Sequence, residues 1–170
     1  MFWLGRSISE YHTLKGLLCK SSFSLEWATA TFSRFGYMMR YLFENYIILT
    51  KTGLLKPTTD ELAQIVRICT KFWFIGAFFT WFTNVIKLVK AQTKMLMLPA
   101  EAAEEIQKTQ KQRNAMLYTV FATFGDMTNS AKGSQAAQTV LGIEPTAQFI
   151  ARVGMIGGLM QTAEKFGKTA

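Results

Sequence analysis

The chain has 170 residues, of which 49% are hydrophobic and 18% are charged, and its net charge is +8. Soluble globular domains carry roughly 25% charged residues, so this composition indicates a membrane or a large hydrophobic interface. With three Pro and twelve Gly, the chain does not fit the collagen-like, Pro-rich or disordered classes. The length suits one domain, and we expect a single helical membrane domain over residues 1–170.

The positive charge is spread along the chain. Residues 1–56 carry seven basic and three acidic side chains, and residues 57–100 carry five and two. Nucleic-acid-binding domains usually gather basic residues on one polar face, so no nucleic-acid partner is expected. Lys and Arg beside apolar helices can instead extend to lipid headgroups. This favours membrane lipids, anionic ones in particular, as partners.

Catalytic and metal-binding patterns do not occur in the sequence. Cys19 and Cys69 lie far apart, and His12 is the only histidine, so neither a disulfide framework nor a structural zinc site is predicted. Both cysteines are expected to be small buried residues. Phosphate-binding loops, dinucleotide-binding glycines and hydrolase motifs are also missing. The sequence therefore predicts no enzyme, no metal and no cofactor.

Residues 1–20 have the pattern of a basic amphipathic helix. Leu4, Ile8, Tyr11 and Leu18 form one apolar stripe. Mitochondrial targeting segments share this pattern, but a helix that lies on the surface of a protein or a membrane is the favoured interpretation.

A long amphipathic helix is predicted to follow. It begins at Ser22 or Ser24 as the N-cap and ends at Thr52, with Gly53 as the residue that stops it. Its aromatic residues are interrupted by charged ones, so it is not a clean membrane span.

The next helix is predicted to begin with a capping box, because Glu61 follows Thr58 by three residues. It contains residues 72–86, a segment without charge between Lys71 and Lys87. Fifteen residues rise only about 22 Å, less than the ~30 Å hydrocarbon core, but lysine stems can extend the span. We expect this helix to insert into a membrane through Phe72, Trp73, Phe74, Phe78, Phe79, Trp81 and Phe82.

A third long helix is expected after Pro99, polar at first and apolar over residues 115–125, with a small-residue loop at residues 132–134. Asp126 and Glu44 interrupt apolar helices. Ionisable groups at membrane depth can relay protons, but pairing with Arg34, Arg40 or Arg152 is the favoured role. The predicted intramembrane charges are thus Glu44, Asp126 and Arg152.

The last helix is predicted from Pro145 to Phe166 and carries small residues on one face. In a membrane such a face lets two helix backbones approach closely. The predicted packing residues are Ala147, Ala151, Gly154 and Gly158.

Several segments together resemble one family. Residues 41–49 (YLFENYIIL) lead to residues 51–56 (KTGLLK), residues 71–76 (KFWFIG) begin the hydrophobic helix, and residues 114–126 end in Asp126. With the glycine-rich residues 154–158, this series over residues 30–165 resembles the peroxin-eleven family of peroxisomal membrane proteins, as a short, N-terminally reduced member.

The resemblance implies a non-enzymatic protein that shapes peroxisomal membranes by inserting helices and by lateral association with itself. A second hypothesis is an accessory subunit of a large mitochondrial inner-membrane complex, such as ATP synthase or a respiratory complex. The basic amphipathic start and the excess of Phe, Trp and Met, which suggests apolar surface shared with neighbouring subunits, motivate it. The fold expected in both cases is all-α, with long amphipathic helices and one or two membrane-inserted helices.

Overall fold

The computed structural model describes residues 4–20, 23–99, 102–134, 146–149, 151–153, 155 and 159. Four long helices run through this part of the chain: α1 (Leu4–Leu18), α2 (Leu25–Lys51), α3 (Thr59–Met97) and α4 (Ala103–Ser134). No strand occurs in the described ranges, and the all-α prediction is confirmed. Of the predicted last helix, residues 147–149, 151–153, 155 and 159 are helical, and its remaining residues lie outside the described ones.

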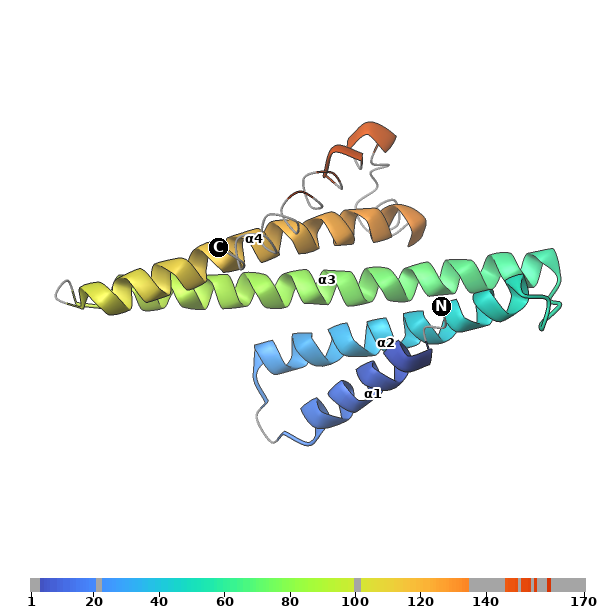
Figure 1. Ribbon diagram of the computed structural model, residues 1–170, viewed down its shortest axis with the longest axis horizontal. Helices are drawn as coiled ribbons and strands as arrows, with labels where there is room; N and C mark the ends of the chain where they lie inside the picture. Colours follow the sequence, from blue (N-terminus) through green and yellow to red (C-terminus); the bar gives the residue numbers. More distant parts are fainter. Residues whose placement is uncertain are drawn as a thin grey trace.

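The helices lie side by side in the order of the sequence, each antiparallel to its neighbour (Figure 1). α1 packs on α2, α2 on α3, and α3 on α4. α3, with 39 residues, is about 58 Å long and contacts both α2 and α4. Figure 1 shows α2 and α4 on opposite flanks of α3, and the α3–α4 end projecting beyond α2. The result is an open row of helices and not a closed bundle.

The helix ends follow from local chemistry as predicted. The Ser24 side chain accepts a hydrogen bond from the Trp27 amide and caps the start of α2, and Thr52 is the C-cap at its end, followed by Gly53 at φ +78°. This left-handed conformation suits glycine because it has no Cβ. At the start of α3, the Thr58 hydroxyl accepts from the Glu61 amide and the Glu61 carboxylate accepts from the Thr58 amide. The predicted capping box is therefore present.

Two local predictions are wrong. The helix α4 continues through residues 132–134, where a small-residue loop was expected, because a glycine in a helix costs only about 1 kcal/mol relative to alanine. Cys69 is buried as expected, but Cys19 is exposed, because it directly follows the end of α1.

Candidate membrane-embedded site

Large apolar side chains lie mainly on the outside of the helical row. Phe32 of α2 is 54% exposed and Phe121 of α4 is 51% exposed. The buried residues of α2 and α3 are instead small or polar: Thr29, Ser33, Gly36, Asn45, Cys69, Gly76, Ala77 and Thr83. Lipid tails are as apolar as leucine, so helices in a bilayer associate through small residues and interhelical hydrogen bonds. The burial pattern therefore fits a row of helices that lipid covers.

The helix α3 is long and apolar enough to cross a membrane, and it alone passes that test in the described part of the chain. Only 17% of its most apolar window is buried inside the protein, whereas the central helix of a soluble bundle would be largely covered. Lys71 and Lys87, which flank the uncharged segment, are both exposed. A span of α3 through a membrane thus leaves both lysines near the headgroups.

Some of the aromatic residues predicted to insert contact the neighbouring helices α2 and α4, and others lie on the surface. Phe79 stacks on Phe32 of α2 with ring centres 5.1 Å apart, and the rings of Trp81 and Phe124 of α4 are 6.1 Å apart. Phe78 is 36% exposed. The remaining members of the predicted set, Phe72, Trp73, Phe74 and Phe82, are partly exposed along α3. Their insertion into a bilayer stays a prediction.

The helices α2 and α3 approach each other closely. The Ser33 and Thr80 hydroxyls are 2.6 Å apart, and the Thr83 hydroxyl donates to Thr29 at 2.9 Å. About one turn from the Ser33–Thr80 pair, on the side away from Thr29 and Thr83, Gly36 lies very close to Gly76. A Cβ on Gly36 would lie 2.5 Å from the Gly76 nitrogen. We call this set the hydroxyl–glycine interface; its residues are Thr29, Ser33, Gly36, Gly76, Thr80 and Thr83.

The hydroxyl–glycine interface was not predicted from the sequence, and the packing face predicted on the last helix stays a prediction. Ala147 and Ala151 are exposed, and Gly154 and Gly158 lie outside the described residues. A signal for the hydroxyl–glycine interface is present in both helices, because Thr29, Ser33 and Gly36 recur at helical spacing in α2, as do Gly76, Thr80 and Thr83 in α3. Small and hydroxyl residues of this kind are enriched where helices approach closely in membranes.

The charges at the level of the apolar segment lie close to opposite charges or aromatic rings. The Arg40 guanidinium stacks over the Trp73 ring at 4.4 Å and pairs with Glu44 at 3.7 Å. Asp126 is partly buried in α4 and lies within electrostatic reach of Arg40. The third predicted charge, Arg152, is exposed near the C-terminus. Arg40 therefore interacts with both predicted carboxylates, Glu44 and Asp126.

The helix α1 presents the predicted apolar residues Ile8, Tyr11 and Leu18 outward; the fourth residue of the stripe, Leu4, has a side chain outside the described ones. Ile8, Tyr11 and Leu18 are each more than half exposed, whereas Ser7 and Leu14 are buried against α2. Polar contacts hold α1 in this orientation: Arg34 donates to Glu10 at 3.1 Å, Trp27 to the Leu17 carbonyl at 2.7 Å, and Asn45 to Ser7 at 3.4 Å. The stripe is thus available to a lipid surface.

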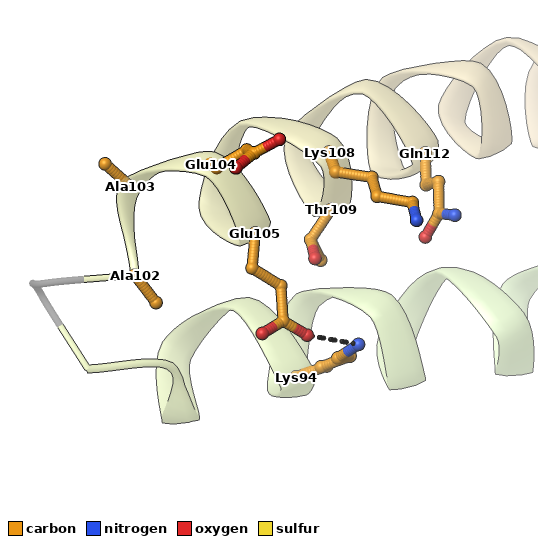
Figure 2. A pocket seen from close by; sticks show the side chains of 8 residues that line it. All are labelled: Lys94, Ala102, Ala103, Glu104, Glu105, Lys108, Thr109 and Gln112. Carbon is orange, nitrogen blue, oxygen red and sulfur yellow. Dashed lines mark ion pairs between the residues drawn. The ribbon is translucent and has the colours of Figure 1, made fainter.

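At the far end of the row, where the chain turns from α3 into α4, lies an open polar cavity of about 620 Å³. Figure 2 shows Lys94 of α3 reaching the Glu105 carboxylate of α4, with their atoms 2.9 Å apart. Nearby, Lys90 donates a hydrogen bond to Glu26 of α2. This bond and the charge of Lys90 lower the pKa of the Glu26 carboxyl. Ion pairs therefore mark the end of the row beyond the apolar segment.

These features together define a helical membrane protein: α3 is apolar, aromatic residues face outward, and small residues lie where the helices meet. The comparisons with known proteins then give the family. The family model of peroxisomal biogenesis factor 11 (PEX11) matches residues 1–165, so the chain belongs to this family, which is the peroxin-eleven family that the sequence resembles. No curated protein and no solved structure gave a significant match.

The family match begins at residue 1, so it includes α1 as well as the region over residues 30–165 on which the resemblance was based. Membership indicates a structural role at the peroxisomal membrane, in a family not known for enzymatic activity. The comparisons give no support to a mitochondrial location or to the accessory-subunit hypothesis.

Proposed function

We propose that this chain shapes the peroxisomal membrane by inserting its helices and by associating laterally with other copies of itself. The observation that carries the proposal is the outward orientation of the large apolar side chains on an open row of helices. Such a row has no closed interior, so lipid is the medium that can cover both its faces.

Two parts of the row have different tasks in this proposal. The helix α3 anchors the protein in the hydrocarbon, with α2 and α4 on its flanks. The helix α1 lies in the boundary between headgroups and acyl chains, with the Ile8, Tyr11 and Leu18 face inserted. An amphipathic helix inserted about 5–10 Å deep adds area to one leaflet and not to the other, and this difference bends the membrane.

The experiment is the deformation of liposomes by the purified full-length protein. Liposomes that contain anionic lipids are expected to form tubules as protein density rises, when viewed by electron microscopy. Ile8→Asp places a charge on the inserted face of α1 and should weaken tubulation. Ser9→Asp adds the same charge at an exposed polar position of the same helix and is the matched control. Liposomes that stay spherical at high protein density would contradict the proposal, as would equal effects of the two substitutions.

A further inference from the structure

A second groove lies between α3 and α4, closer to the apolar segment than the polar cavity. It has a volume of about 470 Å³ and is lined by Leu88, Val89, Gln92, Thr93, Arg113 and Leu117. This volume falls within the ~300–1,000 Å³ typical of ligand pockets. Three of the residues are aliphatic and three are polar, so the groove is suited to a ligand with an apolar part and a polar part.

The groove lies at a defined depth if α3 spans a membrane. Leu88 to Thr93 directly follow Lys87, which ends the uncharged segment, so they rise at most about 9 Å beyond it. Headgroup regions add roughly 5–7 Å to each side of the hydrocarbon core. The groove therefore runs from the edge of the acyl chains to the level of the lipid phosphates.

Arg113 supplies an uncompensated positive charge to the groove. Its Nε and Nη2 atoms donate to the neutral Asn114 Oδ1 at 3.2 and 2.8 Å. The neighbouring Lys90 and Lys94 pair with carboxylates, but no carboxylate of the described residues pairs with Arg113. A guanidinium carries five donors in a planar fork that matches a phosphate, so three donors remain for a ligand.

The polar cavity of Figure 2 is a poorer phosphate site. Glu104 and Glu105 line it, and Glu105 already pairs with Lys94. Carboxylates repel a phosphate and compete for the lysines. From depth, shape and charge together, we infer that the groove between α3 and α4 binds one phospholipid, with its phosphate at Arg113 and an acyl chain along Leu88, Val89 and Leu117. This inference rests on the membrane embedding of the proposed function.

The test is native mass spectrometry of the full-length protein in mild detergent, titrated with phosphatidylglycerol. One tightly held lipid per chain is expected. Arg113→Gln should weaken binding about tenfold, because a hydrogen bond to a charged group contributes enough for such a change. Leu117→Trp fills the groove but keeps the charge, and should also weaken binding. Arg67→Gln removes an exposed arginine from the other end of α3 and should leave binding unchanged.

Equal effects of Arg113→Gln and Arg67→Gln would overturn the proposal. It would also be overturned if inorganic phosphate displaced the lipid completely while Leu117→Trp had no effect, since the ligand would then be a free anion. Circular dichroism checks that each variant keeps its helices, and Arg113→Lys, which keeps the charge without the fork, should bind with intermediate affinity. Because binding is measured in detergent, a wild-type protein that binds lipid but leaves liposomes undeformed would count against the proposed function alone.

Discussion

Replacing Gly36 by alanine tests the hydroxyl–glycine interface directly. A Cβ at this position would lie 2.5 Å from the Gly76 nitrogen, 2.8 Å from the Gly76 Cα and 3.0 Å from the Phe72 carbonyl oxygen. All three atoms belong to the backbone of α3, so no side chain can rotate to make room. The two helices must therefore separate locally by about 1 Å to restore ordinary van der Waals contact.

The size of the effect follows from what this separation changes. Overpacking costs about 1–3 kcal/mol, and the Ser33–Thr80 and Thr29–Thr83 hydrogen bonds would weaken, each contributing about 0.6 kcal/mol in a membrane. The better helix propensity of alanine returns about 1 kcal/mol. We expect Gly36→Ala to lower the free energy of unfolding by about 2 kcal/mol, measured by titrating the detergent-solubilised protein with a denaturing detergent and following its helicity.

Other glycines provide graded controls for the same assay. At Gly76 a Cβ would lie 3.1 Å from the Tyr37 backbone nitrogen and from its ring, so Gly76→Ala should be less destabilising. At Gly5 and Gly16 of α1 a Cβ meets nothing within 4 Å, and alanine there should be neutral or stabilising. If Gly36→Ala proved as stable as the wild type, the close approach of α2 and α3 would be refuted.

Three more predictions follow from the same structure. Ser33→Ala and Thr80→Ala in a double-mutant cycle should show a coupling energy of about 0.6 kcal/mol in the same unfolding assay, and strictly additive effects would contradict their hydrogen bond. Lys90 lowers the pKa of Glu26 in the folded protein, so their pair should stabilise the fold above the ordinary carboxyl pKa of 4.5 and lose this effect as the pH falls below that value. Unfolding midpoints measured against pH should therefore show a small dependence. The same dependence in Lys90→Gln would argue against the pair. The full-length protein should stay with membranes through alkaline carbonate extraction, and its recovery in the soluble fraction would refute a spanning α3.

Elements with strong local signals could be predicted from the sequence. Ser24, Gly53 and the Thr58–Glu61 capping box each act within one turn of helix, so their chemistry can be recognised without knowing the rest of the fold. The family could also be recognised, because its segments follow one another in a fixed order along the chain.

Contacts between helices were harder to predict, since they depend on rotation and register. The proximity of Gly36 and Gly76 requires α2 and α3 to cross at one specific point, and the sequence of one helix alone does not define that point. The apolar stripe of α1 could be read from the sequence, but the burial of Ser7 and Leu14 could not, because it depends on how α1 lies on α2. The groove at Arg113 forms only when α3 and α4 lie side by side, so no single segment of sequence indicates it.

Because each helix packs on its neighbours in sequence, the chain can fold in the order of its synthesis. Short loops join the helices, and proteins rich in such local contacts fold quickly. α1 and α2 can pair as soon as Lys51 has left the ribosome, but α3 is then completed with α2 on one flank and no helix on the other. Until α4 has been made, the most apolar helix of the protein exposes a full flank to water, and during that interval it needs either a chaperone or a membrane.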